Sequence, residues 1–242
     1  MAHSTYLAGP SEARNTWLGE KFPEKKMKIT RILIIVAAVT LGWLGGMATM
    51  SWTKAAAPRM AELTQAQLDD QQRPIADRIM KFSRIGIGGP YHIWLRSPQA
   101  AKPIIDLMDY VRFQSAVPVR LREFSIMIQG RLWRSQVEWA THYQPAINAG
   151  VAPETLMALK ANQRPATMKP DEAAVYDFCT ELFTRHAVSD ETYGRLHQVL
   201  NDQQIVDLTV LQGLYVTAAS TMAMADQGLP PGWDLAFKPG EP

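Results

Sequence analysis

Helix-forming segments separated by glycine and proline fill this chain of 242 residues from Pro58 onward. Apolar residues recur at helical spacing, and no stretch alternates between apolar and polar residues as a half-buried strand would. Ser97 before Pro98 is typical of a helix start, because serine caps the helix and proline fits its first turn. The predicted helices cover 61–86 in one or two segments, 98–114, a segment from 119, 133–148, 153–160, 170–186, 189–200 and 202–224. The pattern therefore predicts an all-α domain.

The region before this domain contains an apolar run, Ile29 to Met50, that is charged only at Arg31. A helix needs about 20 such residues to span a bilayer. Lysines precede the run and Ala55-Ala56-Ala57 follows it, which is typical of a secretory signal, especially if translation starts at Met27 and not at Met1.

The predicted organisation is a polar and basic tail over 1–28, a signal peptide or transmembrane anchor over 29–57, a helical domain over 58–232 and a C-terminal tail over 233–242. The positive flank predicts that the domain lies outside the cytoplasm. It would be periplasmic or extracellular after cleavage, and membrane-anchored without it. Only the N-terminal segment is expected to contact a membrane.

Composition excludes several classes of function. The net charge is +2 and no cluster of lysine and arginine occurs within the domain, so nucleic acid is not an expected partner. The single cysteine, Cys179, rules out an intrachain disulfide and any C-x-x-C redox or zinc motif. Because Cys179 lies among apolar residues at helical spacing, it is predicted to be a small buried hydrophobe.

Four polar residues form the candidate site: Glu123, Ser135, Glu138 and His142. The last three share one face if their segment is helical, since they are spaced three and four residues apart. A hydroxyl, a carboxylate and an imidazole would then meet, which suits proton transfer. Ser135 is less suited to be a nucleophile, because two helical turns, about 10 Å, separate it from His142. It could line the site or cap the helix.

Each of these residues also has a structural interpretation. His142 could be a core histidine satisfied by a carboxylate, and Glu138 could be a surface pairing partner instead of a group that orients the imidazole or protonates a carbanion. Glu123 could pair with Arg122 in solvent. If half-buried, it would have a raised pKa and could act as a general acid. A metal is not expected, because these residues supply at most three ligands.

The residues expected to contact a substrate are Trp133, Ser135, Arg96 and Arg131. Trp133 could exclude water as an apolar wall. Arg96 and Arg131 could hold a carboxylate through a bidentate guanidinium contact, although a solvated surface position is the ordinary alternative for both.

Over about residues 60–232, the chain resembles the carboxymuconolactone decarboxylase family of the AhpD-like superfamily. The matching positions are Gly89-Pro90, Leu95 to Pro98, Arg122-Glu123, Trp133, Glu138-Trp139, His142, Gly150-Val151, Asp171-Glu172, Tyr176, Val188 to Asp190 and Gly213 to Tyr215. The resemblance implies an AhpD-like helical fold and a homo-oligomer, a trimer or hexamer. In the peroxidase branch, two cysteines stand where this chain has Ser135 and Glu138.

A hydroxyl and a carboxylate cannot reduce a hydroperoxide through a thiolate and a resolving thiol. The resemblance therefore favours the decarboxylase branch, whose sites use acid and base groups without a metal or organic cofactor. It implies a carboxy-lyase acting on a small carboxylated lactone or related acid, with Glu123, Glu138 and His142 as catalytic residues. The alternatives are a peroxidase, which the missing thiols disfavour, and a non-catalytic protein that binds a small molecule.

Overall fold

The computed structural model describes residues 57–238. Every regular element in this range is helical, so the predicted all-α class is confirmed. The predicted signal or anchor segment lies outside the described residues, apart from Ala57. In chain order the elements are η1 (Gln65–Gln67), α2 (Gln72–Met80), α3 (Tyr91–Trp94), α4 (Pro98–Asp109), the π-helix η2 (Tyr110–Gln114), α5 (Val119–Leu132), α6 (Gln136–Asn148), α7 (Pro153–Lys160), α8 (Pro170–Arg185), α9 (Asp190–His197) and α10 (Asp202–Ala225).

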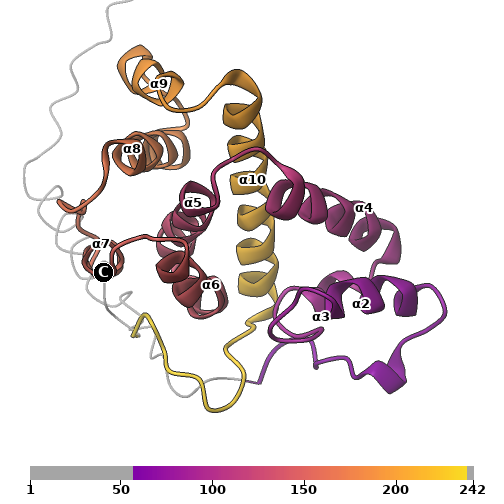
Figure 1. Cartoon of the computed structure of the whole chain (residues 1–242). Helices are drawn as coiled ribbons and strands as arrows, with labels where there is room; N and C mark the ends of the chain where they lie inside the picture. Colours follow the sequence, from indigo (N-terminus) through magenta and orange to yellow (C-terminus); the bar gives the residue numbers. More distant parts are fainter. Residues whose placement is uncertain (1–56, 239–242) are drawn as a thin grey trace, which may run out of the picture. The chain divides into compact units, whose positions relative to one another are not determined.

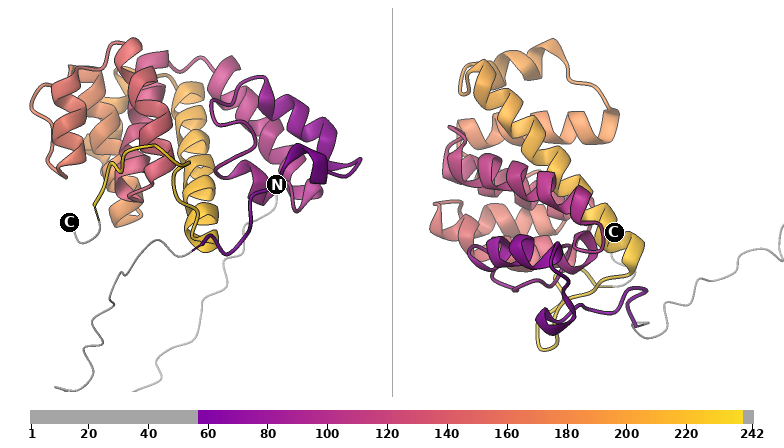
Figure 2. Two further views of the ribbon diagram at one scale, coloured as in Figure 1. Left: turned by 90° about the horizontal axis from the view of Figure 1, so that it is seen from below. Right: turned by 90° about the vertical axis from the view of Figure 1, so that its right-hand side faces the viewer.

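The long helix α10 runs through the middle of the domain (Figure 1). It has α5 and α6 on one side and α4 on the other, and the left view of Figure 2 shows the same order. By length and composition α10 could also cross a membrane, but half of its most apolar stretch is buried among the other helices. A helix that is apolar on all faces is expected at the centre of a core, and α10 holds that place here.

Helix α5 is the second internal element. All residues from Leu121 to Arg131 are buried, because α6, α8 and α10 pack around it. Gly130 does not end or kink this helix. A Cβ on Gly130 would lie 3.4 Å from the Cβ of Glu138, so the missing side chain lets α6 approach α5 closely. This close approach brings the polar residues of the two helices together.

The predicted helix 133–148 starts later than expected. Trp133 is the C-terminal cap of α5 and Arg134 has a φ of 50°, so the chain turns before α6 begins. Ser135 is the N-terminal cap residue of α6. It therefore lies just before the first residue of the helix, with an extended and not a helical backbone.

The segment after α10 packs on α6, although the sequence predicts a tail from residue 233. Gln136 donates to the carbonyl of Phe237 at 2.6 Å and accepts from the backbone N–H groups of Ala236 and Phe237 at 2.8 and 3.2 Å. The ring of Phe237 meets the edge of Trp139 with centroids 5.2 Å apart. Residues 236–237 are consequently buried and belong to the core.

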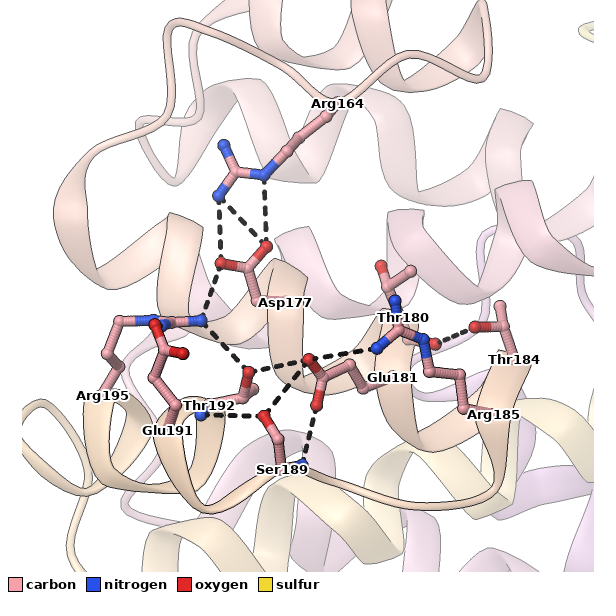
Figure 3. A network of polar contacts seen from close by, with 10 residues as sticks. All are labelled: Arg164, Asp177, Thr180, Glu181, Thr184, Arg185, Ser189, Glu191, Thr192 and Arg195. Carbon is pink, nitrogen blue, oxygen red and sulfur yellow. Dashed lines mark hydrogen bonds and ion pairs between the residues drawn. The ribbon is translucent and has the colours of Figure 1, made fainter.

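A polar network joins α8 to α9 at the other end of the domain (Figure 3). Glu181 accepts from the backbone N–H of Ser189 and from the hydroxyl of Thr192, both at 2.9 Å. Asp177 on α8 forms ion pairs with Arg164 and Arg195. None of these residues lines the cavity described next, so the network holds this helix pair together without contributing to that cavity.

Candidate active site

A cavity of about 260 Å³ lies among the 82–91 loop, η2, α5, α6 and α10. At about 30 Å³ per water molecule, this volume corresponds to roughly nine waters, which suits a small organic molecule. Its polar lining includes Glu123, Glu138, His142, Tyr215 and Arg112. Its apolar lining includes Ile85, Pro90, Met108, Phe113, Val137 and Ala218.

Glu123, His142 and Tyr215 form a hydrogen-bonded chain along one wall. Nδ1 of His142 is 2.7 Å from Oε2 of Glu123, and Nε2 is 3.0 Å from the hydroxyl of Tyr215. The three residues come from α5, α6 and α10, and each is less than a tenth exposed. The antiparallel contact of α5 with α6 therefore makes Glu123, and not Glu138, the carboxylate that orients the imidazole.

The pKa of Glu123 is lowered, contrary to the sequence expectation. Burial alone raises it, but the hydrogen bond and the charge of His142, together with Arg112 and Arg122, outweigh burial. Burial lowers the pKa of His142, and the hydrogen bond to Glu123 offsets part of that shift. Near neutral pH, Glu123 is ionised and His142 is neutral. Its Nδ1–H donates to Glu123, while Nε2 accepts from the Tyr215 hydroxyl.

Glu138 has the opposite environment to Glu123. It is 4% exposed, and burial raises its pKa to about 8. Its Oε2 atom has no hydrogen-bond partner among the described residues. Glu138 is therefore a neutral carboxylic acid near pH 7, within the same cavity as a neutral imidazole. One carboxyl group is held ionised and the other protonated, which separates their chemical roles.

Arg112 is the cavity's cation and was not singled out in the sequence. It lies on the π-helix η2, with its guanidinium carbon 4.9 Å from the ring centroid of Phe113 and 6.0 Å from that of Phe82. Its Nε is buried without a hydrogen-bond partner among the described residues, and no salt bridge to a described carboxylate is formed. Burial lowers its pKa, but Tyr215, Tyr91 and Glu123 reverse the shift and raise it, so Arg112 is charged.

A sequence signal for Arg112 did exist. It follows Met108 by four residues and Ile105 by seven, so an α-helix continued through position 112 would carry it on the same stripe as these two buried residues. Tyr215 carried a weaker signal, because it is one apolar residue among many in α10. Its contact with His142 spans 73 positions and depends on tertiary packing.

Four predicted substrate contacts lie away from this cavity. Trp133 is 42% exposed, so it does not wall off the site. Ser135 occupies the cap position of α6, and its side chain makes no cap hydrogen bond. Arg131 lies over the ring of Phe237, 5.6 Å from its centroid. Arg96 donates to the backbone carbonyls of His92 and Ala61, which fixes the segment preceding α2.

Cys179 is fully buried in the core and is not part of the cavity. Burial also raises the pKa of its thiol, so the reactive thiolate is disfavoured. The prediction of a buried, apolar role is confirmed. Among residues 57–238, no group of three or more histidine, cysteine, aspartate or glutamate side chains is placed to hold a metal ion.

A solved structure is similar to this domain. It is the alkylhydroperoxidase AhpD core of an uncharacterised peroxidase-related protein from Ralstonia eutropha JMP134. The two superpose with a TM-score of 0.62 at 12% sequence identity, over 74% of this chain and 95% of the other. The fold is AhpD-like. No protein-family model and no curated protein sequence matches the chain.

At this level of identity the likeness concerns the fold alone. The AhpD-like arrangement of helices predicted from the sequence is confirmed. An interpretation of the reaction and the substrate has to be argued from the side chains in the cavity.

Proposed function

We propose that this protein is a cofactor-independent acid/base enzyme of the carboxy-lyase type. Its substrate would be a small carboxylated lactone or a related acid. The observation that carries the proposal is that Glu138 and His142, both buried, line one cavity, where burial raises the pKa of Glu138 and lowers that of His142. An enzyme that moves protons near neutral pH needs both a protonated acid and an unprotonated base.

In the proposed reaction, the bond between a substrate carbon and its carboxylate breaks, and CO₂ leaves. The electron pair stays on the substrate, delocalised toward a neighbouring carbonyl. Glu138 supplies the proton that this carbon then takes up, and solvent returns a proton to Glu138. The Glu123–His142 pair serves as the base when a proton must also be removed from the substrate.

Two features of the lining support a carboxylated ligand. Arg112 offers a charged guanidinium without an ion-pair partner among the described residues. It replaces Arg96 and Arg131 as the candidate carboxylate contact. Val137, Ala218 and Pro90 are among the apolar lining residues, beside which a carboxylate would be poorly solvated, and poor solvation of the reacting carboxylate favours CO₂ loss.

The experiment is an NMR assay in D₂O with a panel of small carboxylated lactones and 3-oxo acids. Wild-type protein should release CO₂ from a member of the panel and place deuterium on the carbon that carried the carboxylate. His142→Ala and Glu138→Gln should each reduce the rate by about 10² to 10⁴, the usual contribution of one acid or base. Full turnover by His142→Ala would contradict the proposal.

The similar solved structure is of a peroxidase-related protein, so peroxidase activity is the second candidate. The cavity contains no thiol, which disfavours it. A third candidate is a non-catalytic binding protein. In that case the panel would raise the melting temperature without any product appearing.

The proposal extends to location and assembly. The apolar segment 29–57 and its basic flank support export or membrane anchoring of the domain. A homo-oligomer, trimer or hexamer, is consistent with exposed apolar side chains on α10, including Val206 and Val210. Light scattering on the purified protein measures the number of subunits directly.

A further inference from the structure

Both ring nitrogens of His142 are occupied within the protein. Nδ1 is bound to Glu123 at 2.7 Å and Nε2 to the Tyr215 hydroxyl at 3.0 Å. The imidazole is only 6% exposed, and the Tyr215 ring stands almost perpendicular to it, at 82°. A ligand in the cavity therefore finds neither nitrogen of the base free. Tyr215 lines the same cavity and is itself 4% exposed, and its phenolic oxygen, while donating to Nε2, keeps a lone pair that can accept a proton.

We infer that Tyr215 is the catalytic residue that exchanges a proton with the substrate, and that His142 acts through it. This inference rests on the proposed acid/base function and assigns the contact atom of its base. Glu123 and His142 then become positioning residues that receive and stabilise the proton.

The proton transfer is balanced over two bonds. A carbon-bound proton of the substrate passes to the oxygen of Tyr215, and the electron pair remains on the substrate, delocalised into its carbonyl. In the same step, the original hydroxyl proton of Tyr215 passes to Nε2 of His142. The resulting imidazolium lies against the Glu123 carboxylate. The reverse sequence delivers a proton to the substrate through the same oxygen.

The surroundings of Tyr215 require the two transfers to be coupled. Burial raises the pKa of Tyr215, so a free tyrosinate is disfavoured. The charge of Arg112 lowers this pKa, whereas Tyr91, Glu123 and Glu138 raise it further. In a coupled relay the oxygen loses one proton as it gains another and never becomes an anion. The relay thus uses a buried tyrosine without ionising it.

The decisive variant is Tyr215→Phe, which removes the oxygen and keeps the ring. If Tyr215 is the contact, deuterium exchange into the panel compounds should fall by about 10² to 10⁴, as for loss of a general base. If His142 contacts the substrate directly, the variant uncovers Nε2, and the exchange rate stays the same or rises. That second result would overturn the inference.

Tyr110→Phe is the matched control. It also removes a hydrogen bond of a tyrosine hydroxyl, here a partly buried one to Asp207 at 3.1 Å, but Tyr110 does not line the cavity. It should leave the exchange rate within about twofold of wild type. The comparison separates loss of the relay from a general effect of deleting a hydroxyl, and circular dichroism checks that each variant is folded.

A second measurement does not depend on turnover. The relay requires a neutral His142 that is protonated at Nδ1 and accepts a hydrogen bond at Nε2. Nitrogen NMR of protein labelled with ¹⁵N-histidine reports both states. The Nε2 resonance should then shift toward that of an unbonded nitrogen in Tyr215→Phe. Protonation at Nε2 in the neutral ring would overturn the relay, whatever the panel shows.

The two proposals fail in different ways. If His142→Ala and Tyr215→Phe both keep full activity, the acid/base function itself is wrong. If His142→Ala loses activity while Tyr215→Phe keeps it, the function stands and the assignment of Tyr215 is wrong.

Discussion

Burial acts on Glu138 and His142 in opposite senses, because it disfavours the charged form of each. The carboxyl group becomes a weaker acid and the imidazole a weaker base. Their usual order is thereby inverted, so that the acid holds its proton at a pH where the base has lost its own. Burial is the largest influence on both pKa values, and the hydrogen bond to Glu123 offsets only part of its effect on His142.

This inversion predicts a bell-shaped pH profile for turnover. The rate should rise with pH as His142 loses its proton, at a pKa below the ordinary value of about 6.5, and fall as Glu138 ionises near 8. Rates measured from pH 4.5 to 9.5 test this. In Glu138→Gln the rate that remains should no longer fall at alkaline pH. If it still falls as in wild type, another group causes the decline.

Glu138 also links stability to pH. Its pKa is about 8 when folded and about 4.5 when unfolded, so the folded state binds the extra proton between these values. The free energy of unfolding should therefore fall as pH rises from about 5 to 8, by up to about 1.4 kcal/mol per unit from this group. His142, with its lowered pKa, acts in the opposite direction below about pH 6.5.

Urea denaturation at pH 5, 6.5 and 8 isolates the contribution of Glu138. Relative to wild type, Glu138→Gln should gain stability as the pH rises, because glutamine has no proton to lose. Glu154→Gln, an exposed substitution in the first turn of α7, is the control and should run parallel to wild type. Parallel curves for both variants would mean that Glu138 is ionised in the folded protein.

At the scale of the elements, the pairing of α5 with α6 assembles the site. Helix periodicity predicted that Glu138 and His142 share a face, and both line the cavity. It could not reveal that Glu123 lies closer to the imidazole, because that contact spans 19 positions and depends on how two helices pack. For the same reason the orienting carboxylate was misassigned, and Arg112 and Tyr215 were missed.

The described part of the predicted C-terminal tail, 233–238, is the segment whose role the sequence hid most. Its place after Gly228-Leu-Pro-Pro-Gly232 suggested an extended tail, yet Gln136, the first residue of α6, forms hydrogen bonds with its backbone. A side chain that pairs with a distant backbone leaves no periodic pattern in the sequence. The start of α6 therefore depends on residues about 100 positions later.

Gln136→Ala should loosen this attachment. It removes hydrogen bonds worth roughly 1 kcal/mol each in net stability, so the free energy of unfolding should fall by about 1 to 3 kcal/mol. Tryptophan fluorescence should also change, since Phe237 packs on Trp139. Gln144→Ala, which removes a surface hydrogen bond to Asn148 on the same helix, is the control and should cost less than 1 kcal/mol. Equal losses would show that the attachment adds nothing.

At the scale of the whole molecule, an AhpD-like fold coexists with a cavity that has no thiol. The described domain keeps its single cysteine in the core, where burial suppresses the thiolate. Fold and chemistry are separate properties here, since an arrangement of helices does not decide which side chains face the cavity.

The full chain should therefore show no thiol-dependent consumption of hydroperoxide. Cys179→Ser should change nothing in that assay, although it can lower stability, because it places a hydroxyl among apolar neighbours. Peroxide consumption by wild type that Cys179→Ser abolishes would restore the peroxidase assignment.

The separation of His142 and Tyr215 in the sequence also sets an order of events during synthesis. Ribosomes add about 5 to 20 residues per second, so the 73 positions between the two residues take roughly 4 to 15 s to make. During that interval the emerging chain already has Glu123, Glu138 and His142 but not yet the complete α10. The imidazole has no phenol to bind, and the central helix of the core is incomplete. Proton transfer can thus begin only after α10 has been synthesised and has docked against α5.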